Sequence, residues 1–196
     1  MHTEKNKIND AYLNAINKST ELNSSLIFSY SARIDSIDID SMINYTDKTL
    51  ETKIYWKQKT KRLSFISLGE VLSLNTDKLE KDVINKEIYN ILSNMISLNL
   101  TNENSIPTFI GGQSFDINRS NTNIWAGYPT SNYLVPKILI MNNNNNLTIT
   151  FYYLINKDSA EFDVEDEISK YIGELSNFKS SISKHQPDIS SKSYAL

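Results

Sequence analysis

The chain has 196 residues, of which 39% are hydrophobic and 22% charged, and its formal net charge is −3 at pH 7. A chain of this length can bury a substantial core, and this composition is ordinary for a globular protein. Its Lys and Arg residues form no basic stripe, and no apolar run reaches the roughly 18 residues of a membrane span, so we expect neither a nucleic-acid nor a membrane partner.

Cysteine is absent, and the two histidines, His2 and His185, lie in polar terminal segments. Disulfides and thiolate chemistry are therefore excluded, and a Ser-His-Asp triad or a histidine zinc site is disfavoured. Any acid–base chemistry has to use Asp, Glu, Lys or Tyr. No apolar stretch follows the charged first residues, so we expect no secretory signal and a location in the cytoplasm or the plastid stroma. The abundance of Ile, Asn, Ser and Lys is typical of an AT-rich genome.

The first third of the chain predicts a helix followed by strands. Residues 1–9 are polar and are expected to be loose, and Asp10 can cap a helix that begins there. Residues 26–34 alternate apolar and polar side chains, which predicts a half-buried strand. Residues 53–57 and 63–68 predict the two strands of a hairpin.

A second helix and a β-rich segment follow. Apolar residues at steps of three and four predict a long amphipathic helix over 78–97. Residues 108–110 and 133–141 predict strands, and the run of asparagines at 142–146 predicts a turn into a further strand over 147–155. The last two strands are apolar on successive residues, so we expect both of their faces to be covered.

The last predicted element is a helix over 161–177, and the chain from residue 180 onward is expected to be a frayed tail. Closely spaced strands favour antiparallel pairing, so the order of elements predicts an α+β fold with helices packed on an antiparallel or mixed sheet. We divide the chain into an N-terminal tail and helix (1–24), an α+β domain (25–178) and a polar tail (179–196).

Three local patterns could suggest a binding site, and each has a simpler structural explanation. A calcium loop counted from Asp35 would need glycine where Asp40 stands and glutamate where Thr46 stands. The acidic run at 161–167 sits at a predicted helix start, where carboxylates favour the helix dipole. The pair Gly111-Gly112 lacks the remaining residues of a phosphate loop, so we expect at least one of the two to be needed for a positive φ or a close strand approach.

One stretch is more specific. It contains IPTFIGGQSFD (106–116), WAGYP (125–129) and YLVPKI (133–138), and it follows FSY (28–30), IYW (54–56) and SLGE (67–70) in the same order. This series resembles the N-terminal region of the chorismate-utilising enzymes, in particular the isochorismate synthases of menaquinone and phylloquinone synthesis. The anthranilate and aminodeoxychorismate synthases share that fold but match these landmarks less well. The motif residues are Phe109, Gly111, Gly112, Phe115, Asp116, Trp125, Pro129 and Pro136.

The resemblance implies an α+β fold like the N-terminal half of those enzymes. In the family, the chorismate site, the general-base lysine, the general-acid glutamate and the Mg²⁺-binding glutamates lie in the C-terminal half, so no catalytic, cofactor-binding or metal-binding residue is assigned here. We expect the motif residues to fold the β-core.

Two interpretations stay open. The chain is either the inactive N-terminal part of a truncated or split isochorismate synthase, completed by a separately encoded C-terminal half, or a non-catalytic binding or structural subunit or remnant. For the first, we expect an uncovered apolar face on strands 133–141 and 147–155.

Overall fold

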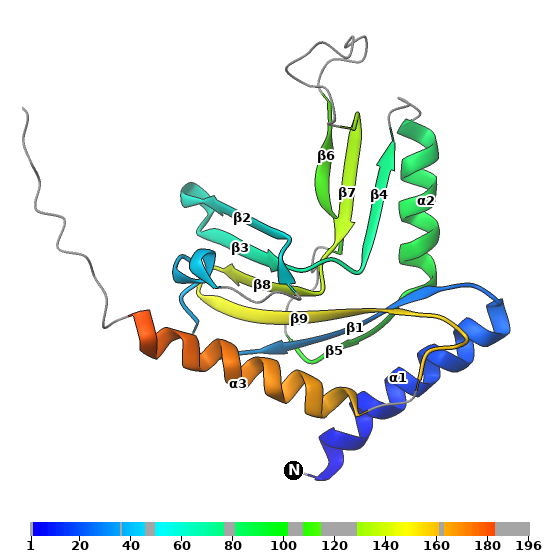
Figure 1. Cartoon of the computed structure of the whole chain (residues 1–196), viewed down its shortest axis with the longest axis horizontal. Coiled ribbons are helices and arrows are strands. Elements are labelled where there is room, and N and C mark those ends of the chain that lie inside the picture. The colour runs from blue at the N-terminus through cyan, green and yellow to red at the C-terminus, as the bar shows by residue number, and fades with distance from the viewer. Residues whose placement is uncertain are drawn as a thin grey trace, which may run out of the picture.

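The computed structural model describes residues 2–35, 37–45, 50–76, 81–101, 108–114, 129–160 and 163–182. This part of the chain forms an α+β fold (Figure 1), as the sequence predicts. No helix within it is long and apolar enough to cross a membrane. Its helices are α1 (His2–Leu22), α2 (Lys81–Asn94) and α3 (Val164–Ile182), with the 3₁₀ turns η1 (Ser41–Asn44) and η3 (Lys59–Lys61). Its strands are β1 (Leu26–Arg33), β2 (Lys53–Gln58), β3 (Leu63–Leu68), β4 (Leu72–Thr76), β5 (Ile96–Asn99), β6 (Ile110–Gln113), β7 (Ser131–Val135), β8 (Ile138–Asn143) and β9 (Asn146–Ile155).

The strands form two sheets. The larger has six strands in the order β2-β3-β8-β9-β1-β5, and the smaller has three in the order β4-β7-β6. The predicted hairpin is confirmed as β2 and β3. All pairs are antiparallel except β1 with β5, so the large sheet is mixed. Figure 1 shows the small sheet rising from one face of the large one.

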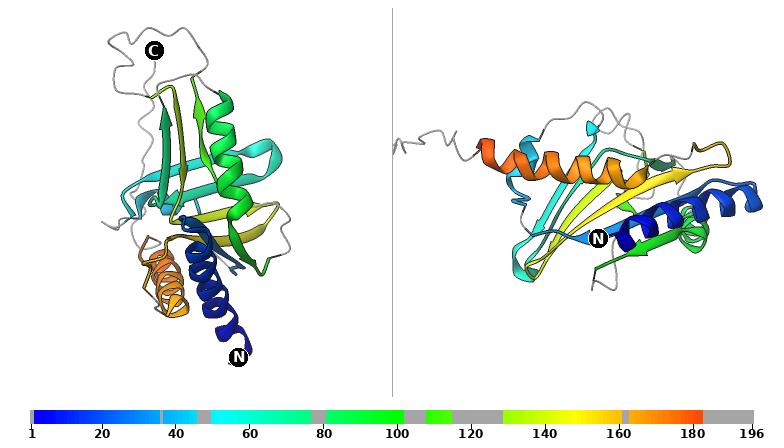
Figure 2. Two further views of the ribbon diagram at one scale, coloured as in Figure 1. Left: turned by 90° about the vertical axis from the view of Figure 1, so that its right-hand side faces the viewer. Right: turned by 90° about the horizontal axis from the view of Figure 1, so that it is seen from below.

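Helices α1 and α3 lie together on the opposite face of the large sheet (Figure 2). Their apolar sides close the main core over residues from the inner strands, including Phe28, Ile66, Ile138 and Ile149, each with no exposed surface. Aromatic rings join the layers, because Tyr12 of α1 contacts Phe28 edge-to-face at 5.7 Å between ring centroids. Burial of these side chains is the main source of stability for this half of the fold.

Strand β1 differs from the half-buried strand that its alternation predicts, because both of its faces are buried over most of its length. Its serines are accommodated by pairing with neighbouring strands. Ser29 Oγ donates to Ser97 Oγ at 3.0 Å, and the hydroxyls of Ser31 and Thr150 are 2.9 Å apart. A buried hydroxyl costs little free energy once it is hydrogen-bonded, so small polar residues can occupy a covered face.

Strands β8 and β9 are central and covered on both faces, so the expected uncovered apolar face on 133–141 and 147–155 is wrong. One face meets α1 and α3, and the other packs in a second cluster that contains Leu134, Val135, Leu139 and Tyr152. On these two strands Leu154 is the exposed large apolar side chain (41%), and others lie on α2 at Val83 (53%) and Tyr89 (71%) and on the edge strand β2 at Trp56 (41%).

The N-terminal helix begins earlier than predicted. Residues 1–9 are not a loose segment, because α1 starts at His2 and Asp10 lies inside it. Ile8 is only 5% exposed and belongs to the main core. The sequence pattern did not predict the first residues of α1 as helix, because polar residues there outnumber Ile8, the apolar side chain that anchors them to the core.

The predicted helix over 78–97 is shorter than its apolar pattern indicates. Helix α2 ends at Asn94, and the next residues form β5, which pairs in parallel with β1. The partner strand lies far away in sequence, so local periodicity cannot reveal it. The apolar face predicted for this helix is only partly used, since Ile84 is buried while Val83 and Leu92 are more than 40% exposed.

The predicted strand over 133–141 is two strands that belong to different sheets. The break lies at Pro136 and Lys137, between β7 and β8. The antiparallel segment that pairs with this run breaks at the same place, between the end of β3 at Leu68 and the start of β4. The sequence analysis did not predict β4. Leu68 pairs with Ile138 and Leu72 pairs with Val135. Leu72 is four residues after Leu68, whereas Ile138 is only three residues after Val135, so the segment between β3 and β4 carries one extra residue. Such a bulge bends a two-stranded ribbon and increases its twist. We call this bend the corner.

The asparagine turn and the last helix agree in part with their predictions. Asn144 and Asn145, both at positive φ, make the predicted turn between β8 and β9. Asp163 accepts a hydrogen bond from the backbone N–H of Asp166 at 3.1 Å and so caps α3. The helix reaches Ile182, past the predicted end at 177, and residues 183–196 lie outside the described residues. The domain boundaries stay a prediction.

Replacing Phe28 by Ala should lower the free energy of unfolding by about 3–5 kcal/mol, because its buried ring would leave a cavity between α1 and the sheet. Leu154→Ala is the matched control, since Leu154 is 41% exposed, and it should cost less than about 1 kcal/mol. Urea unfolding followed by circular dichroism measures both. Equal losses in the two variants would contradict this assignment of the core.

Candidate functional site

The motif region is built on the small sheet, and Gly111 is its constrained position. Gly111 lies on β6 opposite Tyr133 of β7. A Cβ added to it would lie 2.0 Å from the carbonyl oxygen of Asn132 and 2.7 Å from the Cα of Tyr133. Both contacts are with backbone, which cannot rotate away, so only glycine fits here. This is the close strand approach that the sequence predicts for at least one of the two glycines.

The remaining motif residues serve the same small sheet where they are described. A Cβ on Gly112 would meet no atom within 4 Å. Phe109 is half-buried and packs against the second cluster, and Pro136 is buried at the corner. Pro129 precedes β7 and is half-buried. Phe115, Asp116 and Trp125 lie outside the described residues. The structure therefore places Phe109, Gly111 and Pro136 in packing positions.

A groove of about 370 Å³ runs between β4 and α2, beside this sheet. Its walls are Ser73 to Thr76 on the strand and Val83, Ile84 and Glu87 on the helix. Among these residues Glu87 is the one acid–base group. A single carboxylate without a partner acid or base does not make a catalytic site.

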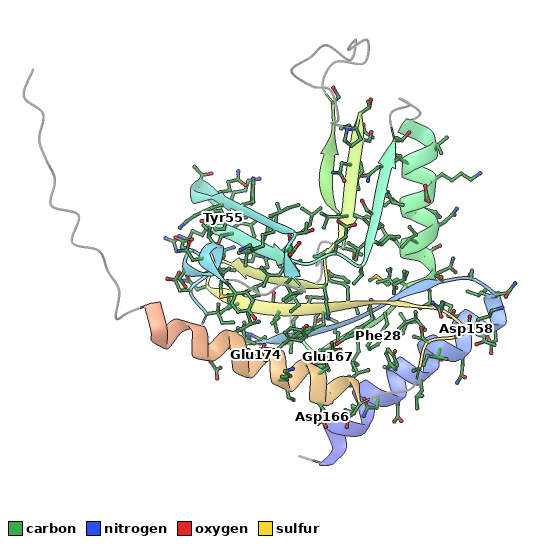
Figure 3. The ribbon with its side chains drawn as sticks, viewed as in Figure 1. Phe28, Tyr55, Asp158, Asp166, Glu167 and Glu174 are labelled. Carbon is green, nitrogen blue, oxygen red and sulfur yellow. The ribbon has the colours of Figure 1, made fainter. Side chains whose placement is uncertain are left out.

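The structure also brings a lysine and a glutamate together where the sequence analysis did not single out a site. Lys137, at the corner, donates hydrogen bonds from Nζ to Tyr171 Oη at 3.0 Å and to Glu167 Oε1 at 3.3 Å. Its ammonium also lies 5.0 Å from the centroid of the Tyr171 ring, within the range of a cation–π interaction. Glu167 lies on the side of α3 that faces the sheet (Figure 3). We call these three residues the corner cluster.

Charge interactions in the corner cluster hold Lys137, at the corner, against Glu167 and Tyr171 of α3, and we call this contact the clamp. Burial alone would lower the pKa of Lys137, but the hydrogen bond with Tyr171 and the charge of Glu167 outweigh it, and its pKa lies above the ordinary value. Lys137 thus stays protonated at neutral pH and cannot act as a general base. Burial also raises the pKa of Tyr12 and of Tyr153, and the charge of Glu167 raises both further. These phenols stay neutral. One sequence signal was available for Lys137, a charged residue inside an apolar run.

The described residues contain no group of three or more His, Asp or Glu side chains placed to hold a metal ion. The acidic residues that the sequence analysis weighed have other roles. Asp40 pairs with Lys57 and Tyr55, and the acidic first turn of α3 follows the capping residue Asp163.

Comparison with known proteins gives two findings. A family model described as chorismate binding enzyme matches residues 12–195. Isochorismate synthase MenF of Bacillus subtilis (strain 168) is 23% identical over 137 residues, which are 65% of this chain and 29% of that enzyme. The chain therefore spans less than a third of the length of the curated relative that it matches.

Gly111→Val should destabilise the protein by about 3 kcal/mol, because the new side chain overlaps the backbone of β7. Gly112→Val is the matched control on the next residue, where a Cβ meets open space, and its cost should stay within about 1 kcal/mol. Thermal and urea unfolding of the two variants measure the difference. Equal stability of the two would mean that the close approach at Gly111 is not a constraint.

Lys137→Met should cost about 1–2 kcal/mol at neutral pH, because it leaves a partly buried carboxylate without its cation. Since the pKa of Lys137 is raised in the folded state, its contribution is fully present below the unfolded value of 10.5. The contribution is lost as the pH rises through the folded pKa. Urea midpoints of the wild type and the variant should therefore differ at pH 7 and converge once the pH exceeds the raised pKa of Lys137 in the folded protein. Lys157→Met, at an exposed lysine, is the control, and a difference that does not change with pH would contradict the clamp.

Proposed function

The chain belongs to the family of chorismate-binding enzymes, and on this premise we propose that it is the N-terminal part of an isochorismate synthase. An isochorismate synthase converts chorismate to its isomer isochorismate, for menaquinone or phylloquinone synthesis. The observation that carries the proposal is the match to the Bacillus subtilis isochorismate synthase. The order of the landmarks IYW, SLGE, IPTFIGGQSFD and YLVPKI along this chain supports it.

In this proposal the chain supplies the scaffold, and the reacting groups come from another part of the enzyme. Lys137 and Glu167 are a lysine and a glutamate, the residue types that could serve as base and acid, but they form an ion pair in which the lysine is protonated. The glycine motif is used for strand contact at Gly111. The described residues also do not fit the Mg²⁺ that the family uses, because none of their acidic side chains gather into a metal-binding group. A C-terminal chorismate-binding part, on the same or a separate polypeptide, is the proposed partner.

The purified chain should therefore form no isochorismate from chorismate and Mg²⁺. The assay follows isochorismate by liquid chromatography, with the intact Bacillus subtilis enzyme as positive control and a production host that lacks its own isochorismate synthases. Turnover above the uncatalysed background would show that the chain carries catalytic groups and would overturn the scaffold role.

A chimaera tests the proposed reaction itself. The matched segment of the Bacillus subtilis enzyme is replaced by the corresponding residues of this chain, and the chimaera is assayed with chorismate. Isochorismate should form at a measurable rate, because the segment supplies the same scaffold. A matched chimaera with Gly111→Val should lose stability and activity together. A chimaera that folds as stably as the parent but makes no isochorismate would favour the non-catalytic subunit instead.

A further inference from the structure

A polar hollow of about 380 Å³ lies at the end of the large sheet, formed by three segments that are distant in sequence. Its walls come from residues 37–40, from the adjoining ends of β2 and β3, and from the turn between β8 and β9. Figure 3 labels Tyr55 on β2, at this end of the sheet, and Glu167 of the corner cluster on α3. The hollow shares no residue with the groove or the corner cluster.

Asp40, Lys57 and Tyr55 form a hydrogen-bonded network at one rim of the hollow, in which the charges of Asp40 and Lys57 cancel. Asp40 accepts hydrogen bonds from Lys57 Nζ at 2.5 Å and from Tyr55 Oη at 2.8 Å. These bonds hold the pKa of Asp40 below its ordinary value and that of Lys57 above it. Both groups are therefore ionised at neutral pH and neutralise each other. The charge left to act on a ligand comes from Asp38 and Arg62.

Arg62 lines the hollow, and its backbone has an unusual conformation. Its φ is +47°, in the left-handed region that non-glycine residues rarely adopt. Its carbonyl oxygen accepts a hydrogen bond from the N–H of Asn144 at 3.1 Å, which ties the two turns together. Within the described part of the chain its guanidinium group makes no hydrogen bond or ion pair, and it lines the hollow. A planar guanidinium in a concave site is suited to a carboxylate, which it can bind through two parallel hydrogen bonds.

A second polar group faces the same space. Ser64 is only 8% exposed, and its hydroxyl has no hydrogen-bond partner among the described residues. Its oxygen is not among the buried side-chain atoms left without a partner, so it is open to the hollow, where a ligand can reach it. The carboxamides of Gln58 and Asn145 also line the hollow and can donate or accept. Asp38, which also lines the hollow, accepts one hydrogen bond from the N–H of Asp40 at 3.1 Å, which leaves it further acceptor capacity.

We propose that this hollow binds a small hydroxycarboxylate, with the carboxylate paired to Arg62 and the hydroxyl donating to Asp38. Ser64 supplies a further hydrogen bond to the carboxylate. Arg62, which is exposed and pairs with no described residue, thereby gains a charged partner within the hollow. The site does not depend on the proposed enzymatic role, because all of its residues belong to this chain and none of them belongs to the glycine motif.

The test uses the purified full-length chain labelled with ¹⁵N and titrated with L-malate, at constant ionic strength. Amide shifts should saturate and should centre on residues 37–40, 62–64 and 142–145. Succinate, which differs from L-malate only by the missing hydroxyl, should bind several-fold more weakly. A titration with no saturable shift, shifts centred elsewhere, or equal binding of the two acids would each overturn the proposal.

Variants locate the site. Arg62→Gln should weaken L-malate binding by about tenfold or more, because it removes a charge-assisted pair. Ser64→Ala should weaken it by a smaller factor. Lys61→Gln is the matched control, since it removes the same charge from the neighbouring exposed residue that does not line the hollow. Its affinity should equal that of the wild type. Each variant's melting temperature is measured first, and unchanged affinity in a folded Arg62→Gln protein would overturn the proposal.

Discussion

The corner is the constraint on which the rest of the architecture depends. There, two paired chain segments leave the large sheet together and enter the small one. The backbone N–H of Lys137 donates to the carbonyl of Leu68 at 3.1 Å, and the N–H of Val71 donates to the carbonyl of Val135 at 2.9 Å. Pro136 fits between them because it has no N–H to satisfy. One bend therefore sets the relation between the two sheets.

Gly69 and Lys137 lock that bend from its two sides. Gly69 has a φ of +65°, and a Cβ on it would lie 2.8 Å from Leu50 Cδ2 and 3.1 Å from Lys137 Cβ. Lys137 in turn reaches α3 through Glu167 and Tyr171. The carbonyl of Lys137 accepts a hydrogen bond from Tyr152 on β9. The corner thus joins both sheets, a helix and a central strand through a few residues, so a change here affects elements that are far apart in sequence.

This arrangement separates the places where chemistry could occur from the places where the fold is made. The family motif serves strand contact at Gly111, and the lysine–glutamate pair serves the corner. The hollow at the far end of the large sheet differs from both, because Arg62 and Ser64 keep polar groups that no described residue satisfies. Polar groups that line a hollow in this way are suited to binding a ligand there, whatever the reacting groups of the complete enzyme are.

The sequence by itself determined the fold class, the hairpin of β2 and β3, the asparagine turn and the need for a constrained glycine. These follow from local rules: alternation of side chains, turn preferences and the missing Cβ. Tertiary structure alone decided the rest. The partner of β5 is a strand some 68 residues away in the register of Ser29 with Ser97, so its residues are predicted as helix when considered alone. The run 133–141 is apolar apart from Lys137, and only the corner divides it between two sheets. The ion pair of Lys137 with Glu167 and the hollow around Arg62 likewise need segments brought together from distant positions, which no local pattern specifies.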